Sequence, residues 1–258
     1  MSPAVTRPSA AAIFRFLAFA AASMLCLASC ASTGNTARSL AEVTPRPPVP
    51  ASLIDTSVPV YTTATGIEYV RTPDERFAHL KDFPYQAHYL EVDGLRLAYE
   101  DEGPREAPVV LMLHGQPDWS YLYRKMIPPI TAAGYRCIAL DLMGFGRSDK
   151  PIDGAIHTCE RHVAWVKAFI HGLGLKDITL FCQDWGGLIG LRIVGDEPEL
   201  FTRVVAANTT LPVMAEGAKG QPHQRFDAGH FIQDDLGPQM AAIVVKFIED
   251  NPLPAGGT

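Results

Sequence analysis

The sequence predicts an α/β fold in which a mostly parallel sheet is covered by helices on both faces. Short, continuously apolar runs alternate with segments of helical periodicity from Val109 onward. Strands of this kind are buried on both faces, which is typical of parallel sheets. Before them, two segments of strand character flank Asp93-Gly94, a strong signal for an antiparallel hairpin. A hairpin followed by repeated strand–helix units favours one α/β domain.

The expected elements follow the chain in order. The hairpin strands are bounded by the Asp-Gly turn, and the later strands are short apolar runs that end at turn residues. The helices are longer segments with an apolar face, as in the one where His162, Trp165 and Phe169 recur at helical spacing. Strands are expected at 87–92, 95–100, 109–113, 136–140, 178–183, 204–207 and 223–226, and helices at 121–133, 162–173, 186–194 and 238–249.

Residues 1–29 are typical of a secretion signal. Arg7 and Arg15 precede the apolar run 16–27, which is too short to span a bilayer comfortably but suits the hydrophobic region of a signal peptide. The following Leu27-Ala28-Ser29-Cys30 resembles the bacterial lipoprotein box. This resemblance implies that Cys30 is lipidated and that the protein is anchored to a membrane of the cell envelope, facing the periplasm or the exterior. An ordinary cleaved signal with an incidental cysteine is the alternative.

Composition indicates the domain boundaries and argues against nucleic acid, metal and cofactor as partners. Residues 30–70 are rich in Pro, Ser and Thr and are expected to form a tether, 71–249 the folded domain and 250–258 a tail. The formal net charge of −6 and the absence of a basic block argue against nucleic-acid binding. No Cys-x-x-Cys motif or Cys/His cluster occurs, so neither a metal nor a cofactor is expected. Cys137 and Cys182 lie in apolar strands and are expected to be buried.

The motif Gln183-Asp184-Trp185-Gly186-Gly187 stands between an expected strand and an expected helix. That context is typical of a nucleophile elbow, a sharp turn that presents a reactive side chain at the carboxyl end of the sheet. An Asp at its centre favours attack on saturated carbon or an epoxide, through an ester that water then hydrolyses. The simpler alternative is that Asp184 caps the following helix.

Two further segments complete the candidate site. His114-Gly115-Gln116-Pro117 follows a strand, and in this context the amides of Gln116 and Trp185 are the candidate oxyanion donors. His114 itself is expected to be structural. The turn 141–148 lacks the glycine pattern of a dinucleotide site and is also interpreted as structural. His230 precedes the last helix and is the candidate general base.

Residues 71–212 resemble the haloalkane dehalogenases of the α/β-hydrolase superfamily. The resemblance rests on Arg71–Phe77, His114–Lys125, Gly144–Pro151 and the elbow motif, and it extends to 217–248. It implies an α/β-hydrolase fold with Asp184 as nucleophile and His230 as the base that activates water. It also implies that the indole of Trp185 and the side chain of Gln116 bind the departing halide, and that the substrate is a small halogenated molecule.

The sequence departs from the family between the elbow and His230. The family places a helical cap, a further helix and a further strand there, whereas this chain has only the connector 209–222, with an apparent internal deletion near 212–217. The cap is therefore expected to be missing or vestigial. The acid that orients the histidine is unassigned, since Asn208 stands at one family position for it. The strand 223–226 is expected to pair directly with 204–207 and to displace His230 by about one strand spacing, roughly 4.8 Å.

Three functions remain open at this stage. The first is a haloalkane dehalogenase-like hydrolase with impaired turnover. The second is an epoxide hydrolase-like enzyme of the same fold, for which the elbow is equally suited. The third is a non-catalytic remnant lipoprotein that retains the motifs without a working pocket.

Overall fold

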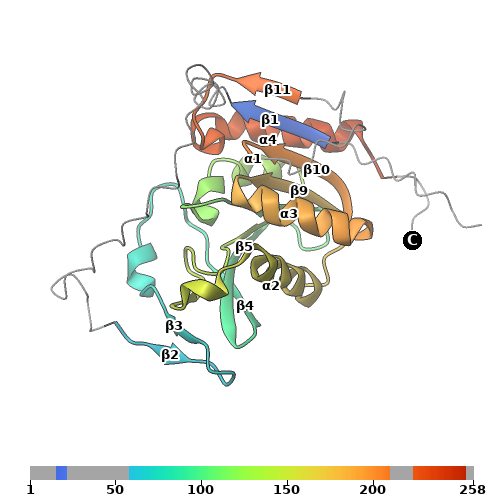
Figure 1. Cartoon of the computed structure of the whole chain (residues 1–258). Helices are drawn as coiled ribbons and strands as arrows, with labels where there is room; N and C mark the ends of the chain where they lie inside the picture. Colours follow the sequence, from blue (N-terminus) through green and yellow to red (C-terminus); the bar gives the residue numbers. More distant parts are fainter. Residues whose placement is uncertain (1–15, 22–57, 210–222, 254–258) are drawn as a thin grey trace, which may run out of the picture.

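The computed structural model describes residues 16–21, 58–209 and 223–253. Its main sheet has eight strands in the order β11-β1-β10-β9-β6-β7-β5-β4 (Figure 1). The hairpin pair β4–β5 and the pair β5–β7 are antiparallel, and every other neighbouring pair is parallel. The strands are β1 (Phe16–Ala21), β4 (His88–Val92), β5 (Leu95–Glu102), β6 (Val109–Leu113), β7 (Arg136–Leu140), β9 (Ile178–Gln183), β10 (Phe201–Ala207) and β11 (His223–Phe226). The predicted mostly parallel sheet with an antiparallel hairpin is confirmed.

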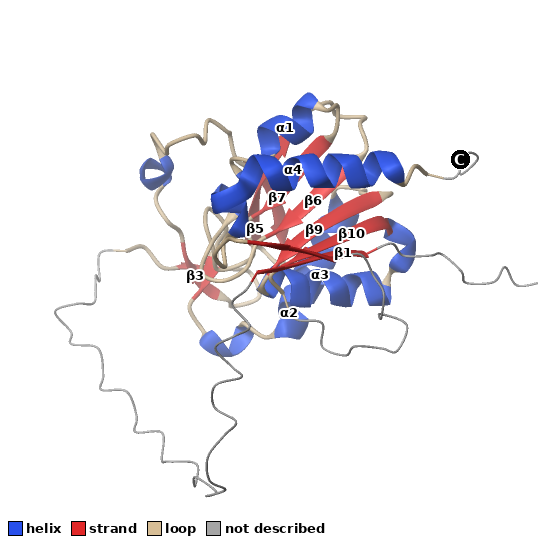
Figure 2. Ribbon diagram, turned by 90° about the horizontal axis from the view of Figure 1, so that it is seen from above, coloured by secondary structure: helices blue, strands red, loops and turns tan. Residues whose placement is uncertain are grey.

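Helices cover both faces of this sheet, as the sequence predicts (Figure 2). Helices α1 (Ile127–Ala132) and α4 (Ile232–Asp250) lie on one face, and α2 (Cys159–Gly172) and α3 (Trp185–Asp196) lie on the other. Strand β6 contributes to both cores, because successive side chains point to opposite faces of a strand. Val110 and Met112 pack with α1 and α4, whereas Leu111 and Leu113 pack with α2 and α3.

The helix expected over 121–133 is divided in two. A 3-10 turn at Ser120–Tyr123 is followed by α1, which begins only at Ile127. Pro128 and Pro129 explain the break, because neither can donate to the carbonyl four residues earlier. In the first turn of α1 that missing donor costs nothing. Helix α2 begins three residues earlier than expected, because Thr158 caps its amino end.

A small second sheet shows that the folded domain begins before residue 71. Strands β2 (Tyr61–Thr62) and β3 (Glu68–Val70) pair with each other, and β3 pairs with β8 (Lys150–Pro151). Tyr69 on β3 is buried against the main core. The predicted tether 30–70 is therefore wrong at its carboxyl end. The ranges 30–57 and 254–258, which include the rest of the tether and most of the tail, lie outside the described residues.

Strand β1 lies between β10 and β11, at a place where no strand was expected (Figure 1). It runs parallel to both, with Phe16 opposite Val204 and Ala18 opposite His223. The prediction that 223–226 pairs directly with 204–207 is wrong, because this distant segment of the chain takes the intervening position. The six residues of β1 belong to the range 1–29 that is predicted to be a signal peptide, which remains a prediction.

Within the ranges that the structure describes, no helix combines the length and apolar character needed to cross a bilayer. Cys30, the candidate lipidation site, and the apparent deletion near 212–217 lie outside those ranges.

Candidate active site

Asp184 stands at the junction of β9 and α3, where the sequence predicts the elbow. Its backbone has φ 51° and ψ −123°, a conformation that a residue with a Cβ rarely adopts. The strain turns the chain sharply from strand to helix and presents the carboxylate at the carboxyl end of the sheet. Its side chain forms no capping hydrogen bond with α3, so the alternative of a simple helix cap is not supported.

Glycines allow three chain segments to meet at this turn. A Cβ on Gly186 would lie 2.1 Å from the carbonyl oxygen of Leu113 at the end of β6. A Cβ on Gly115 would lie 2.3 Å from the Cβ of Asp184. Since real Cβ atoms do not approach other heavy atoms so closely, glycine is required at both positions. The packing brings the loop after β6 against the elbow.

This packing gives the two oxygens of the Asp184 carboxylate different partners. Oδ1 accepts a hydrogen bond from the backbone amide of Gln116 at 3.0 Å. Oδ2 lies 3.5 Å from Nε2 of His230. The predicted lateral displacement of His230 is therefore wrong. Strand β1 fills one strand position between β10 and β11, so the loop after β11 returns His230 to the elbow.

Three carboxylates lie near His230 in the sequence, Asp227, Asp234 and Asp235, and none of them forms an ion pair with His230 among the described residues. Asn208 donates from Nδ2 to the backbone carbonyls of Gly229 and His230, at 3.2 and 2.9 Å. Asp234 pairs with Arg124 and Lys125, and Asp235 accepts from the amide of Gly229. In the described part of the chain, Asp184 is the one carboxylate within ion-pair distance of a His230 ring nitrogen.

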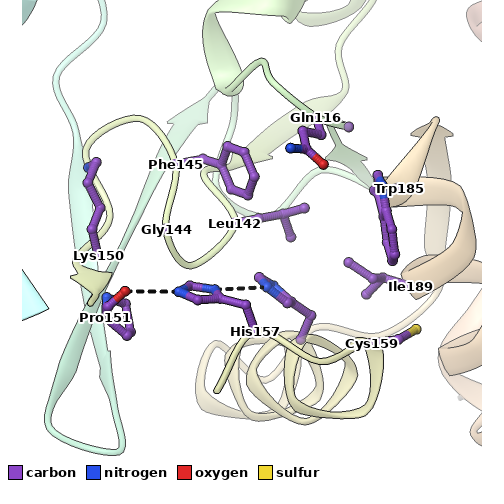
Figure 3. Close-up of a pocket in the computed structure, with 12 residues that line it drawn as sticks. Gln116, Leu142, Gly144, Phe145, Lys150, Pro151, His157, Cys159, Trp185 and Ile189 are labelled. Atoms are coloured by element: carbon purple, nitrogen blue, oxygen red, sulfur yellow. Dashed lines mark hydrogen bonds between the residues drawn. The ribbon is translucent and has the colours of Figure 1, made fainter. Parts of the chain in front are cut away.

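A cavity of about 330 Å³ opens beside the elbow (Figure 3). Gln116 and Trp185 face it from one side, and Leu142, Phe145 and Ile189 supply much of its apolar wall. Trp185 is 43% exposed, which is unusual for so large an apolar side chain. Asp184 does not line the cavity, but Trp185 follows it in the chain and the amide of Gln116 bonds to it. The cavity thus adjoins the carboxylate.

Two histidines form the opposite wall of this cavity. Nε2 of His157 lies 3.0 Å from the carbonyl of Pro151, which can only accept, so this nitrogen carries the proton. Nδ1 of His157 is then bare and accepts from Nε2 of His162 at 3.4 Å. Burial lowers the pKa of His162 to about 4, so the ring of His162 is neutral at physiological pH. This ring adds a polar, uncharged group to the wall.

His114 is structural in its contacts, as the sequence indicates. It is fully buried, and its Nε2 accepts from the amide of Leu142 at 2.9 Å while Nδ1 donates to the carbonyl of Gly115 at 2.8 Å. Burial lowers its pKa to about 4, so the ring is neutral. It ties the loop that carries Gln116 to the end of β7. Cys137 and Cys182 are fully buried, as predicted.

Sequence reasoning missed two residues that contact the site. Gln183 donates from its side-chain amide to the ring and the carbonyl of His230, and Thr209 donates from Oγ1 to the carbonyl of Asp184. Gln183 belongs to the elbow motif, but its partner lies 47 residues away, and no spacing in the sequence indicates that contact. The hydroxyl of Thr209 likewise gives no signal in the sequence.

Comparisons with known proteins show the fold family of this chain. A family model described as the alpha/beta hydrolase fold matches residues 108–238. A haloalkane dehalogenase from Psychrobacter cryohalolentis is 58% identical over 151 residues, which are 57% of this chain and 50% of that protein. One from Mycobacterium marinum is 52% identical over 151 residues, 57% of this chain and 51% of that protein.

Among solved structures, the tetrameric haloalkane dehalogenase from Paraglaciecola agarilytica superposes with a TM-score of 0.55 at 40% identity. The match covers 73% of this chain and 67% of that one. The chain spans about half the length of the curated relatives it matches.

Proposed function

This chain belongs to the α/β-hydrolase fold family, and on that premise we propose that it hydrolyses carbon–halogen bonds with Asp184 as the nucleophile. The main support for the proposal is that the two oxygens of the Asp184 carboxylate have different partners. One oxygen is held by the Gln116 amide, and the other is directed towards His230. The similar haloalkane dehalogenases support the choice of substrate class.

The first step is displacement of halide by Oδ2 of Asp184. A bond forms between this oxygen and the substrate carbon, the carbon–halogen bond breaks, and halide leaves with the bonding electrons. The indole N–H of Trp185 and the side-chain amide of Gln116 border the cavity and are the proposed halide donors. The product is an alkyl ester of Asp184.

The second step is hydrolysis of that ester. His230 accepts a proton from a water molecule through Nε2, and the resulting hydroxide adds to Cγ of Asp184. Charge then develops on Oδ1, which the Gln116 amide already binds at 3.0 Å. Collapse of the intermediate breaks the Cγ–Oδ2 bond, and the leaving alkoxide takes the proton from His230 and departs as the alcohol. The carboxylic acid formed on residue 184 then loses its proton to solvent, which restores the carboxylate.

We further propose that ester hydrolysis is slow relative to alkylation. A carboxylate that accepts from Nδ1 stabilises the imidazolium formed when water is deprotonated. Among the described residues, the acids near His230 in the sequence (Asp227, Asp234 and Asp235) form no ion pair with its ring, and Asp184 faces Nε2 instead. Overall turnover is expected to be weak for a separate reason. The chain has only the connector 209–222 where the family has its cap, and a nucleophile exposed to water alkylates more slowly.

Halide release from a short bromoalkane tests the proposal. The full chain is expected to give a burst of about one bromide per protein followed by slow turnover, and the Asp184→Ala variant is expected to release none. Mass spectrometry is expected to show the alkyl adduct on Asp184, accumulating further in a His230→Gln variant. Release by Asp184→Ala at the full rate would contradict the assignment. Adducts formed from epoxides but not from bromoalkanes would favour epoxide hydrolysis, and the absence of any adduct would favour a non-catalytic protein.

For localisation, we propose that Cys30 is lipidated and that the protein is held at a membrane of the cell envelope. The support is the Leu27-Ala28-Ser29-Cys30 motif after an apolar run. Cys30→Ser is expected to abolish precursor processing and to release the protein from the detergent phase. Unchanged processing and partitioning in that variant would contradict the proposal.

A further inference from the structure

We propose that Gln183 is a positioning residue that decides which ring nitrogen of His230 acts as the base. Gln183 is fully buried at the end of β9, immediately before the elbow. Its amide nitrogen lies 3.0 Å from Nε2 of His230 and 3.3 Å from the backbone carbonyl oxygen of the same residue. One amide group therefore contacts both the ring and the backbone of the candidate base.

The backbone carbonyl determines the orientation of the Gln183 amide. A carbonyl oxygen can only accept, so the group facing it must be the –NH₂ of the side chain and not its oxygen. The reversed amide would place two oxygens against each other and lose the hydrogen bond to the backbone carbonyl, even if its oxygen accepted from a protonated Nε2. The side-chain oxygen is then buried without a partner in the described part of the chain. Burying an oxygen without a partner costs free energy, so a side chain that served only for packing would not need an amide at this position.

The orientation of the amide in turn determines the tautomer of His230. Because Gln183 donates to Nε2, this nitrogen must be bare and the neutral ring carries its proton on Nδ1. Nε2 is also the ring nitrogen that lies 3.5 Å from Oδ2 of Asp184. The lone pair that could accept a proton from water is therefore on the side of the ring that faces the nucleophile.

This inference rests on the proposed function for its catalytic meaning, but not for the tautomer itself. In triad enzymes the tautomer is set from the other side, by an acid that accepts from Nδ1–H. Here a donor at Nε2 produces the same tautomer. Gln183 gives no charge to stabilise the imidazolium, and its amide must leave the lone pair before water can bind there. It thus selects the correct base while leaving ester hydrolysis slow.

Nitrogen-15 NMR of histidine-labelled full-length protein tests the tautomer directly. Spectra are recorded at alkaline pH, which keeps histidine side chains neutral, and the His230 signals are those missing from a His230→Gln variant. We expect the native protein to show a bare Nε2 and a protonated Nδ1. Gln183→Leu is expected to shift the population towards a protonated Nε2. Gln183→Glu, which can only accept, is expected to convert Nε2 to the protonated form.

Gln233 offers a matched control. It is a second fully buried glutamine, three residues beyond His230, and both of its side-chain polar atoms lack a hydrogen-bond partner in the described part of the chain. Gln233→Leu is expected to leave the His230 tautomer unchanged. A Gln183→Leu spectrum identical to the native one would overturn the proposal.

Single-turnover kinetics with a bromoalkane add a readout that separates the two steps. The bromide burst requires no base, so we expect it to be unchanged in the Gln183 variants. Ester hydrolysis is expected to slow about two- to fivefold in Gln183→Leu, in proportion to the competent tautomer, and about 100-fold or more in Gln183→Glu. Equal rates of ester hydrolysis in all three proteins would overturn the proposal. No burst in the native protein would instead refute the proposed function, and the NMR result would still decide the tautomer.

Discussion

Gly186 has room for a hydrogen atom as its side chain and for nothing larger. A methyl group there would meet the backbone carbonyl of Leu113, which cannot rotate away as a flexible side chain could. We expect Gly186→Ala to lower the free energy of unfolding by about 1–3 kcal/mol, the usual cost of overpacking a core. We also expect it to suppress alkylation, because relief of the clash moves the elbow. Urea unfolding and the bromide burst measure the two effects.

Gly195 on the same helix is the control for that substitution. A Cβ at this exposed position would have no heavy atom within 4 Å. Gly195→Ala is expected to raise the free energy of unfolding by about 0.5–1 kcal/mol, through helix propensity alone. A destabilisation as large as that of Gly186→Ala would show that the close approach to Leu113 is not the cause.

Buried titratable residues predict how stability depends on pH. Burial lowers the pKa of His114 to about 4, below the ordinary value of 6.5, so the unfolded chain binds more protons between these values. The contribution of the neutral His114 is complete above pH 6.5 and is lost as the pH falls through about 4, a loss of about 3 kcal/mol. Burial raises the pKa of Glu100 to about 7. Protonated Glu100 therefore contributes fully to the free energy of unfolding below pH 4.5, and this contribution is lost as the pH rises through about 7.

These two contributions oppose each other between pH 4.5 and 6.5. We therefore expect Glu100→Gln to make the acid-side fall in stability steeper than in the native protein, since the substitution removes a contribution that opposes that of the buried histidines. Gln can still accept the hydrogen bond that Arg147 now donates to Glu100 at 2.7 Å. Urea midpoints at several pH values between 4.5 and 7.5 provide the measurement, and an unchanged slope would contradict the assignment.

At the scale of elements, the start of α2 depends on one side chain. Thr158 precedes the helix in an extended conformation, and its Oγ1 accepts from the amide of Arg161 at 3.1 Å. We expect Thr158→Ala to lower the free energy of unfolding by about 1 kcal/mol. Thr158→Ser keeps the hydroxyl and should retain most of the stability. Since α2 carries Cys159 and His162 into the wall of the cavity, bromide release is expected to weaken only in the Ala variant.

For the whole molecule, β1 connects the two parts of the active site. It is the strand between β10, which leads to Asn208, and β11, which leads to His230. Removal of residues 1–29 would leave one edge of β10 and one edge of β11 unpaired. We expect this truncation to lower the free energy of unfolding by roughly 2 kcal/mol or more, from the lost backbone hydrogen bonds. We also expect faster proteolysis near β11 and disturbed His230 signals in NMR spectra.

Removal of residues 1–15 alone is the matched control, because it spares β1. Its stability and proteolysis are expected to match those of the full chain. Equal stability of both truncated forms would show that β1 is dispensable. The experiment also bears on localisation, because cleavage before Cys30 would remove β1. Mass spectrometry of the amino terminus therefore shows whether the purified protein retains residues 16–21, which can form β1, or has lost them as part of a signal peptide.

Much of the fold and of the elbow could be predicted from short segments of the sequence. Asp93-Gly94 indicates a tight turn by itself, and the apolar run before Gln183 indicates a buried strand. An Asp between that strand and a glycine-rich helix indicates the elbow. A predicted helix boundary was wrong where residues of opposite preference follow each other. Pro128 and Pro129 prevent one continuous helix from residue 121, so the segment forms a 3-10 turn and the short helix α1. Each of these features depends on neighbours within a few residues, and their pattern is visible in the sequence.

The sequence by itself therefore determined the α/β class, the hairpin, the elbow and the identity of the candidate nucleophile. Only the tertiary structure decided that β1 separates β10 from β11, that His230 reaches Asp184, and that the side-chain amide of Gln183 contacts the His230 ring. The physical reason is that strand order and register set which distant residues meet. A shift of one strand position moves a side chain by roughly 4.8 Å, which is enough to make or break a hydrogen bond.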